Sequence, residues 1–204
     1  MTAILSAQDL VVRRGDAPET FDIGRGLTLL NTSRESDSTL LSLTLAGRHR
    51  PHGGTILLDD EPSSHRERFK QIALAGVQEI DSLDRLVRVR DVVREQIAWS
   101  QGFFRRTPHT SEAIKSHKHV ERWLEPLQLE DIDLTEQVGE ISPLDRFRLR
   151  VLLALISRPE ATMLIVDDID QVRDMDLRRQ LLDDLRGVAV HLPVMVNTVN
   201  EEGL

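Results

Sequence analysis

Short apolar runs alternate with helix-like segments along this chain, and that alternation restricts its fold more than any other feature. Strands are predicted for five runs rich in β-branched and other apolar residues: 4–14, 27–30, 55–58, 72–77 and 163–166. Helices are predicted from the spacing of apolar residues in three segments: 38–46, 144–157 and 175–185. Because strands that alternate with helices form α/β cores, the sequence predicts an α/β protein with a mostly parallel sheet.

The pattern changes between residues 81 and 140. Apolar residues there lie at mixed helical spacings, and a polar stretch at 105–118 separates two helical parts. We interpret 81–140 as an inserted helical subdomain, and residues 1–80 together with 141–204 as the α/β core. Near the C-terminus, residues 187–190 and 194–196 have the composition of two short closing strands.

Charge and composition exclude several classes of protein. Lys and Arg total 26 against 34 Asp and Glu, a formal net charge of −8, so general binding to nucleic acid is not expected. The chain has no cysteine, which excludes disulfides, thiolate metal sites and a cysteine nucleophile. The apolar runs are too short to span a bilayer and the N-terminus lacks a secretion pattern, so we expect a cytoplasmic location.

The segment after the second predicted strand has the layout of a phosphate-binding loop. Such loops need glycines for close backbone approach, a lysine for the outer phosphates and a hydroxyl for magnesium. Only the hydroxyls are present, on Ser38 and Thr39, and Asp37 stands in the place of the lysine. Three other residues stand in the places of the glycines: Asn31, Arg34 and Ser36. Taken alone, this segment favours a capped helix after a strand.

The order of features downstream makes the phosphate-loop interpretation stronger. Gln78 follows a predicted strand, Ser142 begins a predicted helix, and the apolar run 163–166 is followed directly by Asp167 and Asp168. With the Pro-x-Gly-Gly turn at 51–54, these features give the chain an overall resemblance to the nucleotide-binding subunits of ATP-binding-cassette (ABC) transporters. The resemblance implies a P-loop NTPase-like core with a mostly parallel sheet, an N-terminal antiparallel β portion and an inserted α-helical subdomain.

The resemblance also implies roles for individual residues, with ATP and Mg²⁺ as cofactors. Magnesium would be held by Ser38, Gln78 and Asp167, and Asp168 takes the place of the catalytic glutamate. The residues implied to contact nucleotide are Asn31, Arg34, Ser36, Asp37, Ser38, Thr39, Gln78 and Ser142. Because aspartate is one methylene shorter than glutamate, the Asp168 carboxylate would sit roughly 1.5 Å further from an attacking water.

Several departures from the family pattern concern the same site. The signature segment resembles Ile141 to Asp145, where Pro143 removes a backbone donor and Leu144 adds a side chain. Val199 stands at the position of the switch histidine, and a valine cannot donate to a phosphate. The adenine-stacking aromatic would fall near the arginines at 13–14.

The loss of the lysine weighs most. Two unit charges about 4 Å apart interact by ~4 kcal/mol at an effective dielectric constant of ~20. Replacing attraction by repulsion roughly doubles that difference, so Asp37 facing a phosphate costs several kcal/mol. ATP binding and hydrolysis are therefore expected to be weak or absent.

Three functions are compatible with these residues. The leading one is a degenerate nucleotide-binding subunit that lies at the inner face of the membrane through an integral-membrane permease on a separate chain. It would form a homodimer, or a heterodimer with another ABC subunit. The alternatives are a divergent ATPase that energises transport, and a non-catalytic scaffold or regulator that retains the fold.

Charged and aromatic residues outside the site have plainer interpretations. Arg146, Arg148 and Arg150 alternate along one predicted helix, so they cannot all share a face, and a salt-bridged surface is expected. The aromatic pair at 103–104 is either packing within the helical subdomain or a contact for the membrane partner.

Overall fold

A computed structural model describes residues 3–32, 38–78, 80–101 and 105–198. The elements follow one another in this order: β1 (Leu5–Val11), β2 (Glu19–Ile23), β3 (Leu27–Asn31), α1 (Ser38–Leu45), β4 (Gly53–Leu58), β5 (Glu61–Pro62), α2 (His65–Gln71), β6 (Ile72–Ala75), α3 (Val89–Ser100), α4 (Ser111–Lys115), α5 (Glu121–Leu124), α6 (Pro143–Ser157), β7 (Met163–Val166), the 3-10 turn η1 (Ile169–Gln171), α7 (Met175–Ala189) and β8 (Val194–Thr198). The strands predicted at 4–14, 27–30, 55–58, 72–77, 163–166 and 194–196 are present, with their ends shifted by a few residues.

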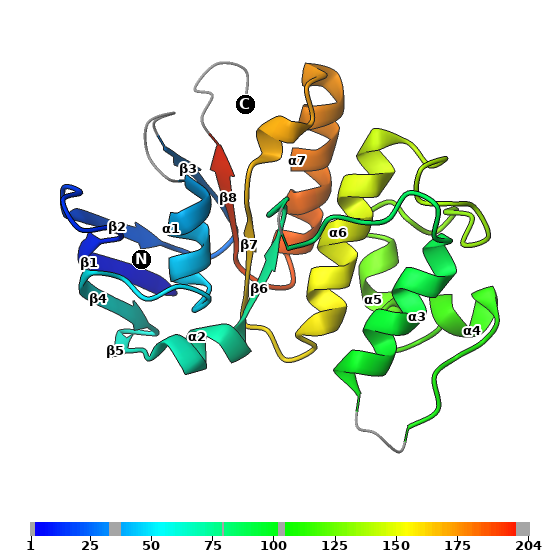
Figure 1. Ribbon diagram of the computed structural model, residues 1–204, viewed down its shortest axis with the longest axis horizontal. Helices are drawn as coiled ribbons and strands as arrows, with labels where there is room; N and C mark the ends of the chain where they lie inside the picture. Colours follow the sequence, from blue (N-terminus) through cyan, green and yellow to red (C-terminus); the bar gives the residue numbers. More distant parts are fainter. Residues whose placement is uncertain (1–2, 33–37, 79, 102–104, 199–204) are drawn as a thin grey trace.

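The strands form two sheets of different kinds. One sheet has the order β3-β8-β7-β6 and all of its neighbours are parallel. The other has the order β2-β1-β4-β5 and is antiparallel. In Figure 1 the antiparallel sheet lies at one end of the molecule and the parallel sheet in its middle, with α1 between them. The predicted α/β class, with a parallel sheet and an N-terminal antiparallel portion, is confirmed.

The parallel sheet separates two hydrophobic cores because successive strand residues point to opposite faces. Leu164 and Val166 of β7 belong to the core formed with α6 and α7, whereas Met163 and Ile165 belong to the core shared with α1 and the antiparallel sheet. All four side chains are completely buried. This burial on both faces explains why β7 is apolar without alternation.

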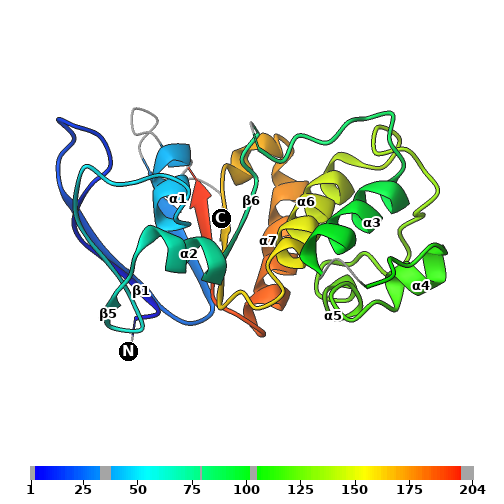
Figure 2. The ribbon, with the colours of Figure 1, turned by 60° about the horizontal axis from the view of Figure 1, so that its bottom comes forward.

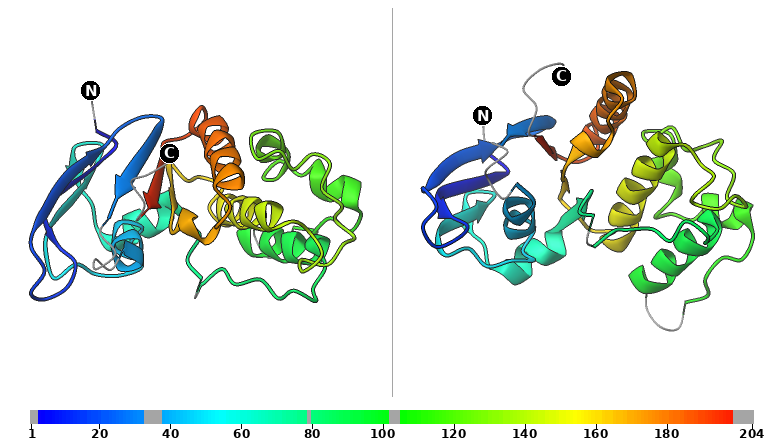
Figure 3. Two further views of the ribbon diagram at one scale, coloured as in Figure 1. Left: turned by 90° about the horizontal axis from the view of Figure 1, so that it is seen from above. Right: turned by 45° about the horizontal axis from the view of Figure 1, so that its top comes forward.

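The helices α3, α4 and α5 lie on the side of α6 and α7 away from the parallel sheet (Figures 1, 2 and 3). Buried residues of this region, including Val93, Ile114 and Trp123, share one hydrophobic cluster with α6 and α7. Because the cluster is continuous, the division into residues 81–140 and an α/β core stays a prediction.

One predicted strand is wrong. Residues 187–189 are the last turn of α7, not part of a strand, and Val190 caps its C-terminus. The helix continues because Leu181, Leu185 and Val188 extend one buried face at helical spacing, and Gly187 permits close packing against the backbone of Pro126. Within the described residues, no helix is long and apolar enough to cross a membrane.

A tight turn at Gly76 connects β6 to the helical region. Gly76 has a φ of +90°, and a Cβ atom placed there would lie 2.0 Å from the carbonyl oxygen of Asp167. The backbones after β6 and β7 are therefore closer than any side chain would allow. Gly15 also has a positive φ, of +103°, but a Cβ atom there would meet nothing within 4 Å.

These two glycines separate the cost of the backbone conformation from the cost of close packing. Gly15→Ala is expected to lower the free energy of unfolding by about 1 kcal/mol, because alanine resists a positive φ. Gly76→Ala adds a backbone clash and is expected to cost more than about 3 kcal/mol or to prevent folding. Urea denaturation measures both, and equal losses would contradict the close approach.

Candidate functional site

The carboxyl ends of the four parallel strands meet at one edge of the sheet, which is where ligands bind in open α/β sheets. Thr32 follows β3, Gly76 follows β6 and Asp167 follows β7, while Asn197 and Thr198 end β8. The helix α1 begins at the same edge, after β3. The first of the predicted nucleotide-contacting residues, Asn31, is the last residue of β3 and is exposed.

Asp167 is the most strongly held residue at this edge. Its side chain is completely buried. One carboxylate oxygen, Oδ2, accepts a hydrogen bond of 2.7 Å from Thr39 Oγ1, and the other, Oδ1, accepts bonds from Ser42 Oγ at 2.7 Å and Asn197 Nδ2 at 3.3 Å. These bonds supply the partners that a buried carboxylate requires.

Asn197 extends this network to the neighbouring elements. Its amide nitrogen donates to the carbonyl oxygen of Ser38 at 2.9 Å and to Ser42 Oγ at 3.1 Å, and its amide oxygen accepts from Thr32 Oγ1 at 2.8 Å. The network therefore joins the ends of β3, β7 and β8 to the first turns of α1.

Asp168 has a strained backbone and an unfavourable electrostatic position. It adopts the left-handed conformation with φ 45° and ψ 58°. Burial raises the pKa of its carboxyl, and the nearby carboxylates of Asp167 and Asp170 raise it further. Asp170 forms a buried ion pair of 2.8 Å with Arg178 and accepts a hydrogen bond from Thr198 Oγ1. Three aspartates thus lie within four residues at this edge.

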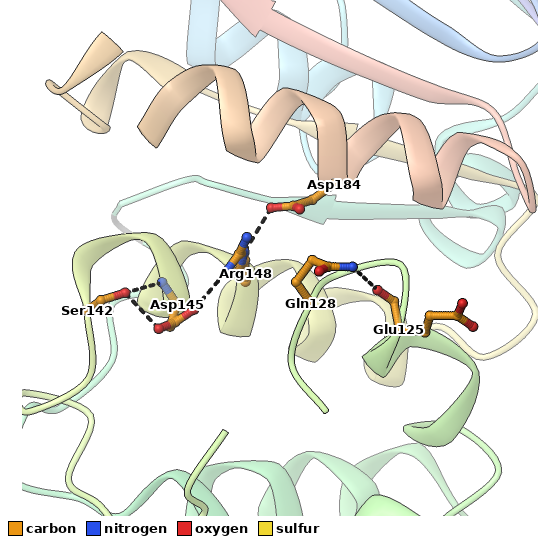
Figure 4. A network of polar contacts seen from close by, with 6 residues as sticks. All are labelled: Glu125, Gln128, Ser142, Asp145, Arg148 and Asp184. Atoms are coloured by element: carbon orange, nitrogen blue, oxygen red, sulfur yellow. Dashed lines mark hydrogen bonds and ion pairs between the residues drawn. The ribbon is translucent and has the colours of Figure 1, made fainter. Parts of the chain in front are cut away.

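Ser142 is the N-cap of α6, as predicted (Figure 4). Its hydroxyl accepts a bond from the Asp145 backbone N–H at 3.0 Å and lies 2.7 Å from Asp145 Oδ2, to which it donates. Asp145 Oδ1 pairs with Arg148 at 3.0 Å, and Arg148 reaches Asp184 of α7 at 2.8 Å. The serine hydroxyl is therefore committed to its own helix, and a carboxylate stands beside it.

Gln78 is exposed and lies beyond the Gly76 turn; its side chain makes no hydrogen bond with the other described candidate residues. Other residues hold the Gly76 turn in place. The Gly76 N–H donates to Asp81 Oδ2 at 2.6 Å, and Gln171 Nε2 donates to the Gly76 carbonyl at 2.5 Å. Gln171 in turn accepts from Arg150 at 2.7 Å. This arrangement fixes the start of the loop that carries Gln78.

Part of the predicted site falls outside the described residues. These are Arg34, Ser36 and Asp37 of the loop before α1, together with Val199 and the aromatic pair at 103–104. Their assigned roles stay predictions.

The sequence interpretation missed Ser42, Asn197 and Thr32. Ser42 lies one helical turn after Ser38 and is completely buried in α1, and Asn197 is a buried polar residue that follows the apolar run 194–196 of β8. A buried polar residue in such a setting needs a partner, and that rule was the available signal.

The arrangement around Asp167 fits bound magnesium poorly. Mg²⁺ requires octahedral oxygen ligands and usually keeps several waters. Asp167 is inaccessible and both of its oxygens accept hydrogen bonds, from the hydroxyls of Thr39 and Ser42. Among the described residues there is no group of three or more acidic or histidine side chains that could hold a metal ion.

Asp81 provides a pH-dependent test of the turn beside this site. Burial raises the pKa of its carboxyl from the ordinary value of 3.8, although the Gly76 N–H and Arg150 oppose the rise. A raised pKa in the folded state means that the ionised carboxylate disfavours folding at neutral pH, and that this penalty disappears as the pH falls.

Asp81→Asn is therefore expected to raise the free energy of unfolding at pH 7.5 by about 1 kcal/mol or less, since Asn keeps an acceptor for Gly76. The gain should shrink as the pH falls through the raised pKa towards 3.8. Denaturation curves of both proteins between pH 7.5 and 4 measure it. A gain that grows on acidification would contradict the burial argument.

The comparisons with known proteins come from structure alone, because no protein-family model and no curated protein matches the sequence. CbiO1 from Clostridium perfringens, part of the ABC transporter complex cbiONQ, has a TM-score of 0.76 at 16% identity, covering 100% of this chain and 81% of that one. A putative ABC transporter ATP-binding protein from Pyrococcus furiosus has a TM-score of 0.69 at 19% identity, covering 97% and 92%.

A third similar structure is the ATP-binding cassette MJ1267 of an ABC transporter, in its ADP conformation. It has a TM-score of 0.71 at 13% identity, and the alignment covers 97% of this chain and 81% of that one. All three similarities extend over nearly the whole chain described here. The chain therefore has the fold of the nucleotide-binding domain of ABC transporters.

Proposed function

We propose that this chain is a nucleotide-binding-domain-like subunit of a membrane transport complex, and that its own site binds and hydrolyses ATP weakly or not at all. The fold supports the first part. Weak ATP binding is supported by the Asp167 carboxylate, which is completely buried and hydrogen-bonded to Thr39, Ser42 and Asn197. A magnesium ion would have to displace at least one of these donors before it could reach the carboxylate.

The charge at this edge of the sheet supports the same proposal. Asp168 adds a second carboxylate beside Asp167, and burial already disfavours its ionised form. In the sequence, Asp37 stands where a phosphate loop carries its lysine. A triphosphate would therefore meet carboxylates where related sites supply a cation, and such repulsion costs several kcal/mol.

The Ser142 end of α6 is also poorly suited to phosphate. A helix N-terminus favours anions because its free N–H groups and its dipole are positive. Here Pro143 has no N–H, the Ser142 hydroxyl donates to Asp145, and Asp145 carries a negative charge. Each of these features opposes binding of a phosphate to the N-terminal N–H groups of α6 and to the Ser142 hydroxyl.

A groove beside the Gly76 turn supports a contact with a partner. It has a volume of about 560 Å³ and is lined by residues of α3 and α6 and of the loop after β6. Ile80 and Trp99 both line this groove and are exposed by 59% and 79%, so they add apolar surface to a groove that also carries charged side chains. We propose that the integral-membrane subunit on a separate chain contacts this groove.

Two other functions remain as alternatives. A divergent ATPase would use Ser38, Asp167 and Asp168, and its Thr39 and Ser42 hydroxyls would have to turn away from Asp167. A non-catalytic scaffold would have neither nucleotide nor membrane partner. The exposed apolar groove favours a partnered subunit over a free scaffold.

Binding of ATP with magnesium tests the proposal directly. The unaltered chain is expected to bind with a Kd weaker than about 1 mM by calorimetry. Asp37→Lys should bind at least tenfold tighter, because it replaces a repulsion by an attraction and about 1.4 kcal/mol corresponds to tenfold. Glu35→Lys makes the same charge change in the same loop and is the matched control, with a smaller gain. Tight binding by the unaltered chain, with turnover abolished by Asp168→Asn, would favour the divergent ATPase.

The partner is tested by isolating the tagged chain from detergent-solubilised membranes of its native cells. A polytopic membrane protein is expected to co-purify, and Trp99→Ser should reduce its recovery at least several-fold. Leu86→Ser is the control, since Leu86 is 78% exposed and does not line the groove. If no integral-membrane protein is recovered with the unaltered chain, the scaffold is the better explanation.

A further inference from the structure

A separate cavity lies between the first turns of α6 and the segment that leads into α7, and it is more basic than the rest of this acidic chain. Its volume is about 410 Å³, within the range of small-molecule sites. Three arginines line it: Arg146, Arg150 and Arg173. None of the three forms an ion pair with a carboxylate in the described part of the chain, although the net charge of the protein is −8.

Two of these arginines are held in place by neutral groups. Arg146 Nη1 donates to the backbone carbonyls of Ile141 at 2.8 Å and Gly139 at 3.2 Å. Arg150 Nη1 donates to the side-chain oxygen of Gln171 at 2.7 Å, and its Nε is buried with no hydrogen-bond partner among the described residues. Their guanidinium groups are therefore held in place without a direct ion pair among the described residues. Because Arg146 and Arg150 are four residues apart, they share one face of α6.

The carboxylates near this cavity form bonds with groups other than its three arginines. Asp174 lines it, but its Oδ1 caps α7 by accepting from the N–H groups of Asp176 and Leu177. Asp145 of α6 does not line it and is paired with Arg148. Asp81 acts on Arg150 only through space. The balance of three arginines and one capping aspartate leaves the cavity positive.

The remaining wall is apolar. Phe147 and Val172 are almost completely buried, and Leu177 and Pro143 complete the lining. An anionic group would meet the guanidinium groups, whose planar donors suit carboxylates and phosphates, while an attached apolar body would rest on Phe147 and Val172.

We propose that this cavity binds a small organic anion, a carboxylate or phosphate carried on an apolar body. Pro143 belongs to the signature-like segment, and Arg150 also lines the groove proposed for the membrane partner. Binding of an anion in this cavity nevertheless requires neither nucleotide nor a membrane partner, so the proposal does not depend on the function proposed above. We expect an aromatic molecule that carries an oxyanion to bind most tightly. An anion without an apolar body, or an aromatic alcohol without a charge, should bind much more weakly.

Titrations followed by backbone amide NMR spectra of the full chain test this, using phenyl phosphate, benzoate, inorganic phosphate and benzyl alcohol. Phenyl phosphate or benzoate should give saturable shifts in the amide signals of residues 144–150 and 171–177, with an affinity at least tenfold higher than that of inorganic phosphate or benzyl alcohol. The tighter of the two identifies the oxyanion. Absence of saturable shifts, shifts confined to 38–42, or equal affinity for all four probes would overturn the proposal.

Substitutions assign the binding to the arginines. Arg146→Gln and Arg150→Gln should each weaken the tighter probe at least tenfold, and Arg173→Gln at least threefold. Arg173 is exposed and makes no hydrogen bond with a described residue, so its substitution removes charge without disturbing the fold. Arg179→Gln, on the exposed side of α7, is the control and should change affinity less than twofold. Unchanged affinity in all three cavity variants would overturn the assignment.

Discussion

The buried carboxylate of Asp167 is the constraint on which the centre of this molecule depends. A buried carboxylate without partners would cost several kcal/mol, and a hydrogen bond to a charged group contributes about 1.5–3 kcal/mol. Thr39, Ser42 and Asn197 supply the donors, and they come from α1 and β8 rather than from the strand that carries the aspartate. The end of β7, the start of α1 and the end of β8 must therefore assemble together.

The same network is the basis of the proposal that this chain binds ATP weakly or not at all. In open α/β sheets, ligands bind at the carboxyl ends of the strands and form hydrogen bonds with the polar groups there. In this chain the polar groups at that edge bond to one another instead: Asn197 donates to Ser42, and Asp170 pairs with Arg178 and accepts a hydrogen bond from Thr198. Polar groups that are satisfied within the protein stabilise the fold, but they offer less to a nucleotide.

The sequence predicted those parts of the structure that depend on neighbouring residues. The cap of α6 by Ser142 and the apolar strand before Asp167 were both recognised. The capping pair Ser64 and Glu67 at α2 is an equally local signal that was missed, because the preceding loop is short and the helix has little apolar periodicity. The end of α7 was misread since Gly187 breaks the pattern locally, whereas in the structure the buried face with Leu185 and Val188 continues the helix and Gly187 packs against Pro126.

By itself the sequence determined the α/β class, the parallel sheet and the position of an aspartate at a strand end, because periodicity and turn residues act over a few positions. Only the tertiary structure decided which groups meet that aspartate. Ser42 lies 125 residues from Asp167 in the chain, and Asn197 lies 30 residues away. The same holds for the cavity beside Arg146 and Arg150, whose apolar wall comes partly from the segment before α7. Contacts at such separations follow from how the layers pack, and no local pattern records them.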